Sequence, residues 1–328
     1  MSAYAIALTR PKEPLERIEL DLAPPGPGEV RVRLEACALG LRDWDVLTLD
    51  GVPRLPLIAG QEAVGRVEAV GEGVALGLGV RVAVTPLATT CAACSLCERG
   101  LERLCAQAQW HGFHRQGALA THGVFAAQHL VSIGDELSAH QVACLVGSGW
   151  SALGALRAAG VGAGQTVAIY GCGGVGHLAI QLARALGARV HVVEPERDRL
   201  HLAQSLGAEP GLPSRGVDAA VVCTPSTQAI AQAVRGVTRG GTVMLVGSSP
   251  TGRFDVSLAD TVFQGLTLRG HVLGSRSDLN EVLELHRRGL VKASVDSAPL
   301  EAAIERLWWL RDGGFVGRLV FDCAGTTI

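Results

Sequence analysis

The chain has 328 residues, of which 48% are hydrophobic and 18% are charged, and its formal net charge is -2. This length favours two domains with a large apolar core. The small net charge provides no broad basic field to attract nucleic acid or an anionic membrane. No apolar stretch approaches the roughly 18 residues of a membrane helix, and the N-terminus does not have the pattern of a secretory signal. We therefore expect a globular cytoplasmic protein that binds neither nucleic acid nor membranes.

Short β-runs broken by Gly and Pro fill residues 1–135. They include Tyr4–Leu8, Val30–Leu34, Ala63–Val70 and Val80–Val84. This pattern predicts a β-rich domain. From residue 138 the apolar residues recur at helical spacing, and Ser138 is a suitable helix N-cap.

Strands and helices then alternate. Strands are expected at Thr166–Tyr170, Ala188–Val193, Val217–Cys223 and Thr242–Val246, and helices at Gly176–Leu186, Glu196–Leu206 and Gln228–Val234. Such alternation predicts a parallel sheet covered by helices on both faces. Two further helical patterns, at 278–289 and 299–312, precede a last strand at Gly317–Phe321.

A dinucleotide-binding motif follows the first of these strands. The strand runs directly into GCGGVG at 171–176, which opens a helix. Gly171 allows the tight turn, Gly173 lets the backbone approach a pyrophosphate, and Gly176 lets helix and strand pack closely, while Gly174 and Val175 complete the turn. The alternative interpretation is an ordinary Gly-rich turn.

An acidic residue supports the nucleotide interpretation. Glu194 ends the next strand, where the ribose hydroxyls of NAD would lie. Its charge would repel the 2′-phosphate of NADP, so the sequence favours NAD over NADP. Arg197 and Arg199 follow closely and would offset that repulsion, unless they are only the solvated start of a helix.

Four of the nine cysteines crowd into one loop. Cys91, Cys94, Cys97 and Cys105 form C-x2-C-x2-C-x7-C. Four thiolates in one loop suit one tetrahedral structural zinc with no open coordination position. The alternatives are an iron–sulfur cluster or four incidental cysteines. One tight cluster and an odd total fit a reducing compartment better than a disulfide framework.

Together these segments resemble the zinc-containing alcohol dehydrogenase family of medium-chain dehydrogenases/reductases, over nearly the whole chain. The segments that carry the resemblance are PGPGEVRVRLEACALGLRDWD, AGQEAVGRVEAVGEGV, CAACSLCERGLERLC, GCGGVG with Glu194, and GFVGRLVF. The resemblance implies a GroES-like domain over 1–145 and 275–328 and a Rossmann domain over 146–274. It also implies a homodimer or homotetramer, and a nicotinamide end lined by Ser148, Val175, Cys223, Val246 and Leu273.

The ligands of the family's catalytic zinc are mostly missing from this chain. By the resemblance, the first Cys ligand falls on Gly40, the His ligand on Gln61, and the later Cys on Cys144, with Glu62 as the acidic neighbour. Gly and a neutral amide do not replace thiolate and imidazole. A shifted metal site made from Cys37, Asp43, Glu62 and Cys144 remains an alternative.

Without a catalytic zinc, other side chains would have to stabilise the developing negative charge and transfer the proton. Arg42 falls where the family has its proton-relay hydroxyl, and Asp45 where it has its relay His. Arg42 would hold a developing oxyanion, while Asp45, Glu62, a Tyr or one of His111, His114 and His122 would move the proton. Ion pairs of Arg42 with Asp45 or Glu62 that are purely structural are equally compatible with the sequence.

Three functions remain in contention. The first is NAD(P)H-dependent hydride transfer to or from a small organic substrate, at an activated C=C, C=N or C=O bond, without a catalytic zinc. The second is a zinc-dependent alcohol dehydrogenase with an unusual ligand set. The third is a nucleotide-binding protein without catalysis.

Overall fold

The computed structural model describes residues 3–48, 51–312 and 315–324. The chain forms two compact units, one made of Met1–Gly147 and Val295–Ile328, the other of Ser148–Ser294. Residues 275–294, which the sequence analysis assigned to the GroES-like domain, thus lie in the second unit. The reason is α9 (Arg276–Arg287): its Asp278 accepts a hydrogen bond of 2.5 Å from Arg157 on α4 (Trp150–Ala158) of that unit.

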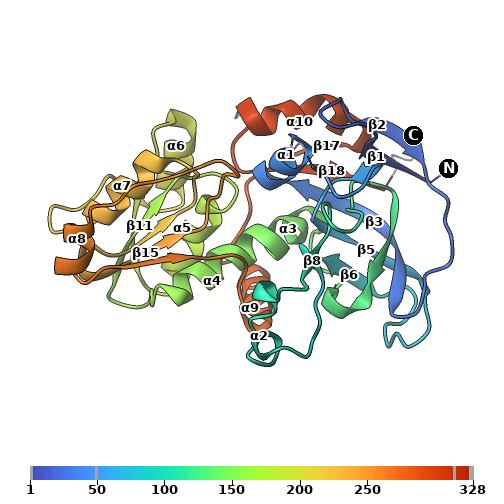
Figure 1. The fold of residues 1–328 in the computed structure, drawn as a ribbon, viewed down its shortest axis with the longest axis horizontal. Coiled ribbons are helices and arrows are strands. Elements are labelled where there is room, and N and C mark those ends of the chain that lie inside the picture. Colours follow the sequence, from blue (N-terminus) through green and yellow to red (C-terminus); the bar gives the residue numbers. More distant parts are fainter. Residues whose placement is uncertain (1–2, 49–50, 313–314, 325–328) are drawn as a thin grey trace. The chain divides into compact units, whose positions relative to one another are not determined.

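The first unit is built on a seven-stranded sheet in the order β10-β6-β5-β3-β18-β17, with β9 also paired to β3 (Figure 1). The strands are β3 (Glu29–Leu39), β5 (Glu62–Val70), β6 (Arg81–Val84), β9 (His122–Ala126), β10 (Val131–Ser132), β17 (Val295–Pro299) and β18 (Arg318–Asp322). Apolar residues alternate along β3 and face the core. Because β18 pairs antiparallel with β3, with Leu319 opposite Leu39, the start of β18 lies beside the end of β3.

Smaller elements complete the first unit. They are β1 (Tyr4–Leu8), β2 (Glu16–Glu19), β4 (Leu57–Ile58), β7 (Leu87–Thr89), β8 (Gln109–Trp110), α1 (Leu41–Thr48), α2 (Ser95–Glu98), α3 (Ala139–Cys144) and α10 (Ala303–Asp312). α1 is a helix inside the region expected to be β-rich. The helical pattern beginning at Ser138 is divided, because a π-helical turn at Leu145–Gly149 separates α3 from α4. Such turns are frequent at functional sites.

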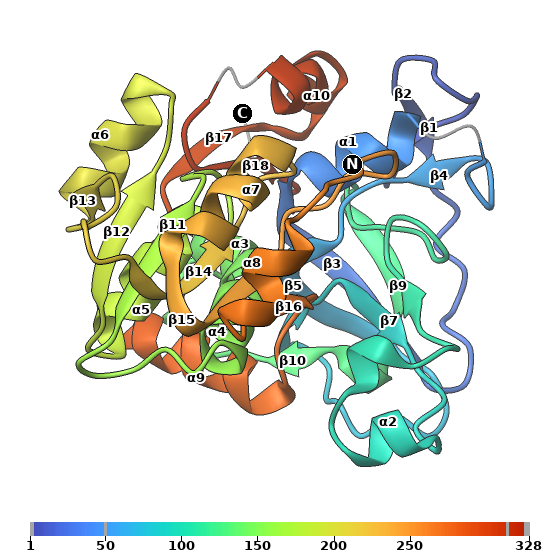
Figure 2. The ribbon, with the colours of Figure 1, turned by 60° about the vertical axis from the view of Figure 1, so that its left-hand side comes forward.

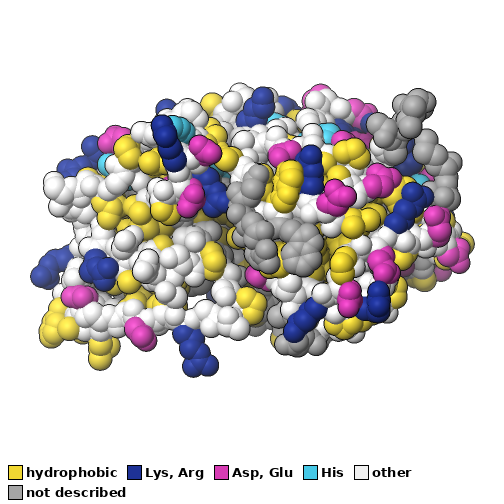
Figure 3. Space-filling view, turned by 90° about the horizontal axis from the view of Figure 1, so that it is seen from above, with side chains coloured by type: hydrophobic (Ala, Val, Ile, Leu, Met, Phe, Trp, Pro, Cys, Tyr) yellow, Lys and Arg dark blue, Asp and Glu magenta, His cyan; other side chains and the backbone are white. Residues whose placement is uncertain are grey.

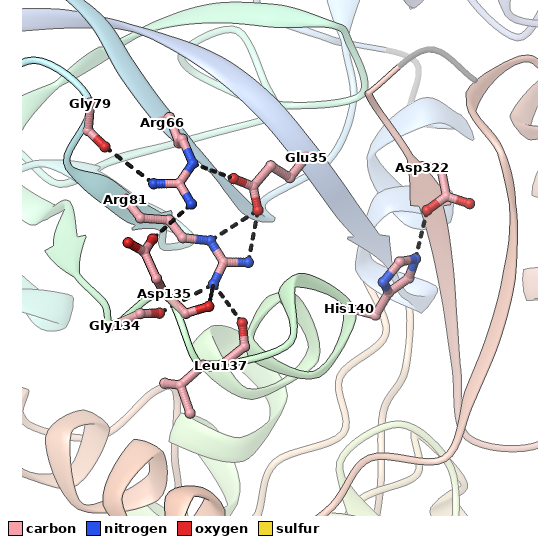
Figure 4. A network of polar contacts seen from close by, with 9 residues as sticks. All are labelled: Glu35, Arg66, Gly79, Arg81, Gly134, Asp135, Leu137, His140 and Asp322. Carbon is pink, nitrogen blue, oxygen red and sulfur yellow. Dashed lines mark hydrogen bonds and ion pairs between the residues drawn. The ribbon is translucent and has the colours of Figure 1, made fainter. Parts of the chain in front are cut away.

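A buried arginine fixes the loop that leads into α3. Arg81 on β6 donates two hydrogen bonds to Glu35, at 2.7 and 2.9 Å, and its Nη1 also donates to the carbonyls of Gly134, Asp135 and Leu137 (Figure 4). Arg66 pairs with the same Glu35 carboxylate. At the other side of α3, His140 contacts Asp322 at 2.6 Å. These contacts hold α3, and with it Cys144, against the sheet.

The second unit contains a six-stranded parallel sheet in the order β13-β12-β11-β14-β15-β16 (Figure 2). Its strands are β11 (Thr166–Tyr170), β12 (Arg189–Val193), β13 (Glu209–Pro210), β14 (Val217–Val222), β15 (Val237–Leu245) and β16 (Thr267–Gly270), and its remaining helices are α5 (Gly176–Ala185), α6 (Arg197–Ser205), α7 (Thr227–Gly236) and α8 (Leu258–Phe263). This strand order is that of a Rossmann fold, as the sequence predicts. Because the crossovers are right-handed, α5 and α6 cover one face of the sheet and α7 the other.

The sequence analysis missed α8, β16 and β17, and it began β15 five residues late. Charged side chains of both signs are interspersed over the face in Figure 3, as the small net charge implies. Among the described helices, none combines the length and the apolar content that would be needed to span a bilayer.

Candidate functional site

The glycine turn after β11 has the local geometry that pyrophosphate binding needs. Gly171 has φ +88°, a conformation that favours glycine, and a Cβ at Gly176 would lie 1.8 Å from the Gly171 carbonyl oxygen. At Gly173, by contrast, a Cβ would meet no other described heavy atom within 4 Å. Two of the glycines are therefore required by the turn itself, whereas Gly173 leaves an open approach to the backbone at the start of α5.

Glu194 follows β12 and is held by the backbone. Its Oε2 accepts a hydrogen bond of 2.7 Å from the Cys172 N–H inside the glycine turn, and its Oε1 accepts one of 3.0 Å from the Glu196 N–H. The carboxylate thus has a fixed position beside the glycine turn. Arg199 on α6 is half-buried and Arg197 is exposed.

The residues expected at the nicotinamide end lie at chain positions that suit this role. Cys223 follows β14 and Val246 follows β15, at the carboxyl ends of parallel strands, where ligands bind in such sheets. Val175 immediately precedes α5. Ser148, in the π-helical turn, and Leu273, which has φ +48°, are both buried.

The four-cysteine loop fits a tetrahedral metal. Its Sγ atoms are 3.5 Å apart for Cys91 and Cys105, 3.6 Å for Cys94 and Cys97, and 3.9 Å for Cys91 and Cys97. Four thiolates around zinc at about 2.3 Å would lie about 3.8 Å apart. The Ala93 N–H, with smaller contributions from neighbouring thiols, lowers the pKa of Cys91 to about 6 and so favours a thiolate. The donor set and its spacing therefore fit one structural zinc.

A second group of residues lies around Gly40 and Gln61, the positions where the resemblance would put two ligands of a catalytic zinc. Gly40 immediately precedes α1, and Gln61 immediately precedes β5. Asp43, which is buried, accepts hydrogen bonds from the Gly40 N–H at 2.9 Å, the Gly60 N–H at 3.2 Å and the Gln61 side chain at 3.3 Å. Burial raises the pKa of Asp43, and these hydrogen bonds oppose that rise.

Arg318 lies beside these residues, and we call the whole group the Arg318 cluster: Gly40, Asp43, Gln61, Glu62, Cys144, Gly147 and Arg318. The Arg318 guanidinium donates to Glu62 Oε2 at 2.6 Å and hydrogen-bonds the Cys144 side chain. A Cβ at Gly40 would lie 2.9 Å from Arg318 Nη1, and one at Gly147 only 2.2 Å from Glu62 Oε1. Arg318 is 5% and Glu62 14% exposed, so the pair is enclosed by protein.

Sequence reasoning missed Arg318. Its only signal was membership in the GFVGRLVF segment, and nothing local indicated that β18 would pair with β3 and place the guanidinium beside Gly40. In the structure Glu62 forms an ion pair with Arg318, which the sequence analysis did not expect, and Arg42 also interacts with Glu62 through its charge.

The other predicted catalytic residues lie on α1, which directly follows Gly40 of the Arg318 cluster in the chain. Arg42 is exposed and stacks over the Trp110 ring at 4.7 Å from its centroid. Partial burial raises the pKa of Asp45, and the Arg42 charge opposes that rise. Trp44 is half-buried against the core of the first unit.

The three candidate histidines, His111, His114 and His122, lie in the first unit and make different contacts, whereas Trp150 lies in the second unit. Burial lowers the pKa of His111 to about 4, and its Nδ1 donates to the Thr85 carbonyl at 2.8 Å. His114 accepts from the Trp110 N–H at 3.2 Å, and His122 lies 3.8 Å from Glu68. Trp150 is buried in the second unit, where its Nε1 donates to the Ser275 carbonyl.

A shifted metal site is not assembled in the described part of the chain. There, three or more potential ligand atoms gather only in the four-cysteine loop. Cys37 is buried in the core, and its Sγ would lie 2.5 Å from a Cβ at Gly60. Burial raises the pKa of Cys144 to about 12. Burial likewise raises the pKa of Cys37, so both thiols favour the neutral form in the absence of a metal.

A Rossmann unit with this glycine turn, joined to a β-rich unit that has a four-cysteine loop, defines a nicotinamide-dependent dehydrogenase class. Residues 26–135 match the family model of the alcohol dehydrogenase GroES-like domain, and residues 174–288 match that of the zinc-binding dehydrogenases. An alcohol dehydrogenase of Geobacillus stearothermophilus is 35% identical over 94% of this chain and 96% of its own length. Another, from Moraxella sp. (strain TAE123), is 34% identical over 93% and 94%.

Solved structures agree with these matches. A crystal structure of an NAD-dependent alcohol dehydrogenase has a TM-score of 0.88 and 28% identity, covering 97% of this chain and 99% of that one. The alcohol dehydrogenase of Aeropyrum pernix has a TM-score of 0.88 and 26% identity with the same coverage. The chain therefore belongs to the zinc-type alcohol dehydrogenase family of medium-chain dehydrogenases/reductases. It is an NAD(P)-dependent oxidoreductase with a small-molecule substrate.

Proposed function

We propose that this enzyme transfers hydride between NAD(H) and a small organic substrate, at an activated C=C, C=N or C=O bond, without a catalytic zinc. The observation that carries the proposal is the composition of the Arg318 cluster. Gly40 and Gln61 offer no thiolate or imidazole to a metal, and the Glu62 carboxylate is already paired with a guanidinium at 2.6 Å. This donor set does not fit a tetrahedral zinc with an open position. A zinc-dependent enzyme with an unusual ligand set is the second candidate.

The proposed chemistry uses residues of α1. The bound nicotinamide supplies or accepts the hydride. The exposed Arg42 guanidinium, oriented by its stacking on Trp110, stabilises negative charge that develops on a substrate oxygen or nitrogen. Asp45, one turn further along α1, has its pKa raised by partial burial and exchanges the proton. Glu62 is held in place by its ion pair with Arg318, so we assign it a supporting role.

We propose that the cofactor is held by the glycine turn Gly171, Gly173, Gly174, Val175 and Gly176. Glu194 would then accept hydrogen bonds from the adenosine ribose, because its carboxylate is already oriented by two backbone N–H groups. A charged carboxylate at this position favours NAD over NADP. Arg199 lies nearby on α6, and Ser148, Cys223, Val246 and Leu273 would line the nicotinamide end.

Metal analysis and hydride transfer test this function together. We expect one zinc per chain, and NADH oxidation with at least one acceptor from a panel of an α,β-unsaturated ketone, a cyclic imine, an aldehyde and a ketone. Activity should survive a chelator that leaves the cysteine-bound zinc in place. A second zinc per chain whose removal abolishes turnover would favour the zinc-dependent alternative.

The role of Arg42 has its own test. Arg42→Ala should reduce kcat/KM by about 10²-fold or more, the usual cost of removing an oxyanion donor, while its thermal unfolding stays close to that of the unchanged enzyme. Arg10→Ala, which removes an exposed arginine paired with Glu16, should leave activity unchanged. Full activity in Arg42→Ala would exclude Arg42 from the mechanism.

We also propose that the enzyme is a homodimer, alone or within a tetramer, formed through α8 and β16. β16 is the edge strand of its sheet, and Leu258, Val262 and Phe263 on α8 are 78%, 63% and 78% exposed. Figure 3 shows apolar side chains protruding at the left, the end at which Figure 1 has α8. An edge strand beside an apolar surface suits a second copy across a two-fold axis.

Light scattering coupled to size exclusion tests this assembly. Phe263→Lys should convert the oligomer to smaller species, whereas Leu78→Lys, at an exposed apolar residue of the first unit, should not. An unchanged mass for Phe263→Lys would exclude this surface.

A further inference from the structure

We propose that Trp150 is a positioning residue for the nicotinamide end of the cofactor site. Together with Gly154 and Arg157 on the same face of α4, it holds the connection 271–275 so that Leu273 keeps a left-handed backbone conformation. The inference rests on the proposed function, because it concerns the cofactor that this function requires. It goes further by naming the contacts that fix one half of the cofactor site before the cofactor binds.

The connection between β16 and α9, residues 271–275, contains a strained residue. Leu273 has φ +48° and is only 3% exposed. A bulky side chain in this left-handed region carries a steric cost, and such a conformation persists only where surrounding contacts hold it. The connection leaves the carboxyl end of the parallel strand β16, at the edge of the sheet where ligands bind. The strain therefore lies where we expect the nicotinamide end.

The indole of Trp150 provides the first contact that holds this connection. Its Nε1 donates a hydrogen bond of 2.7 Å to the Ser275 carbonyl, and the side chain is 4% exposed. The hydrogen bond is therefore shielded from water, and it fixes the backbone two residues beyond Leu273. The N–H of Trp150 is committed to the protein backbone, so we assign Trp150 to positioning the connection rather than to contact with substrate.

Close packing of two glycines provides the second contact. A Cβ at Gly154 would lie 2.5 Å from the Gly274 Cα, and a Cβ at Gly274 would lie 2.9 Å from Trp150 Cδ1. Real Cβ atoms do not approach other heavy atoms so closely, so α4 and the connection touch through bare backbone. Gly274 directly follows Leu273, and its position against α4 limits how far the Leu273 backbone can move.

An ion pair provides the third contact. Arg157 donates a hydrogen bond of 2.5 Å to Asp278 Oδ1, while Asp278 Oδ2 accepts one of 2.7 Å from the Ser275 N–H. Both backbone polar groups of Ser275 are thus held, the carbonyl by Trp150 and the N–H by Asp278. Residues 150, 154 and 157 follow helical spacing, so one face of α4 makes all three contacts, beside α9 (Figures 1 and 2).

These contacts have a consequence for cofactor affinity. Without them, the backbone of Leu273 would relax toward negative φ, and only a fraction of the molecules would keep the conformation that binds the cofactor. The apparent affinity of a ligand falls by that fraction. The glycine turn at 171–176 lies at a different part of the sheet edge and does not depend on α4 in this way. The loss should therefore be confined to ligands that carry the nicotinamide.

Trp150→Phe tests the inference, because it keeps an aromatic ring and removes the N–H. Calorimetry measures the dissociation constants of NADH and of ADP-ribose, which lacks the nicotinamide. We expect the value for NADH to rise about three- to tenfold, as for the loss of one hydrogen bond, and the value for ADP-ribose to stay unchanged. Trp309→Phe, the same change at an exposed tryptophan of the first unit, should alter neither value.

Leu273→Gly shows whether Trp150 acts through the strained backbone. Glycine adopts positive φ about as readily as negative φ, so a free connection would keep the binding conformation about half of the time. Adding Trp150→Phe to Leu273→Gly should therefore raise the NADH dissociation constant by no more than about twofold. The same three- to tenfold rise in both backgrounds would mean that the indole does not act through Leu273, and would overturn the inference.

The other outcomes separate the inference from the proposed function. Equal weakening of NADH and ADP-ribose in Trp150→Phe would indicate a general structural role, and an unchanged NADH dissociation constant would indicate none. Either result would overturn the inference and leave the proposed function standing. Failure of the unchanged protein to bind NADH or NADPH would instead overturn the proposed function.

Discussion

Glu62 on β5 and Arg318 on β18 form a buried ion pair with a contact of 2.6 Å, although 256 positions separate them in the chain. The two strands do not pair directly; β3 lies between them in the sheet. The pair therefore links the two outer strands of the antiparallel triplet β5-β3-β18.

Removing either charge should destabilise the protein more than removing both. Glu62→Gln or Arg318→Met alone leaves one buried charge uncompensated, which typically costs about 3–5 kcal/mol of unfolding free energy. In the Glu62→Gln/Arg318→Met variant most of this loss should be recovered. Urea titrations of the four proteins give the coupling energy directly.

The exposed pair of Arg31 with Glu68 provides the comparison. Glu68→Gln should have a much smaller effect on the unfolding midpoint, because solvent screens such pairs. Simple additivity of Glu62→Gln and Arg318→Met would contradict the idea that the two charges compensate each other.

Gly173 and Gly176 should respond differently to the same added methyl group. The new Cβ in Gly176→Ala would lie 1.8 Å from the Gly171 carbonyl oxygen, so the turn must distort and the thermal unfolding temperature should fall. In Gly173→Ala the Cβ meets no described atom within 4 Å, so stability should persist while NADH affinity falls. Calorimetry measures both quantities, and unchanged NADH affinity in Gly173→Ala would show that the pyrophosphate binds elsewhere.

Glu194 should determine the preference between the two dinucleotides. In Glu194→Gln the carboxylate charge disappears, while the side-chain oxygen can still accept from the Cys172 N–H. The ratio of NADPH to NADH dissociation constants should fall about tenfold, because a phosphate with nearly two negative charges no longer meets a like charge. Arg199→Ala should shift the same ratio in the opposite direction, and an unchanged ratio in Glu194→Gln would remove Glu194 from cofactor selection.

Local patterns in the sequence were enough to predict the Rossmann fold of the second unit, although not its boundary or all of its elements. The alternation of strands and helices, GCGGVG and the acidic residue after the next strand all depend on neighbours within about thirty residues. The four-cysteine loop is equally local. By contrast, α8 has only six residues, too few for helical periodicity to register, and the boundary at Ser294 depends on α9 docking onto α4.

The same distinction between local and long-range information applies to the candidate site. The sequence showed that Gly40 and Gln61 lack the chemistry of metal ligands, because that conclusion needs only residue identity. Which side chain lies beside Gly40 depends on β18 pairing with β3, a contact between segments far apart in the chain. The sequence alone does not show such long-range pairing, so it gave no indication that Arg318 is the partner of Glu62.

His111 should make the stability of the first unit depend on pH. Burial lowers its pKa from the ordinary 6.5 to about 4, and its ring packs edge-on against Phe125, with ring centroids 5.2 Å apart. Between pH 6.5 and 4 the unfolded chain binds a proton that folded His111 does not, so the unfolding free energy decreases as the pH falls. The stabilisation is complete above pH 6.5, and about 3 kcal/mol is lost by pH 4, at about 1.4 kcal/mol per pH unit.

His111→Gln isolates this contribution. Glutamine does not titrate, and its amide can still donate to the Thr85 carbonyl that His111 contacts at 2.8 Å. The variant should be less stable at pH 7.5 because it loses packing against Phe125, but its unfolding free energy should decline less steeply between pH 6.5 and 4.5. Other histidines and the zinc-binding thiolates titrate alike in both proteins, so the difference between the two slopes reports His111. Parallel slopes would mean that His111 becomes protonated without disturbing the fold.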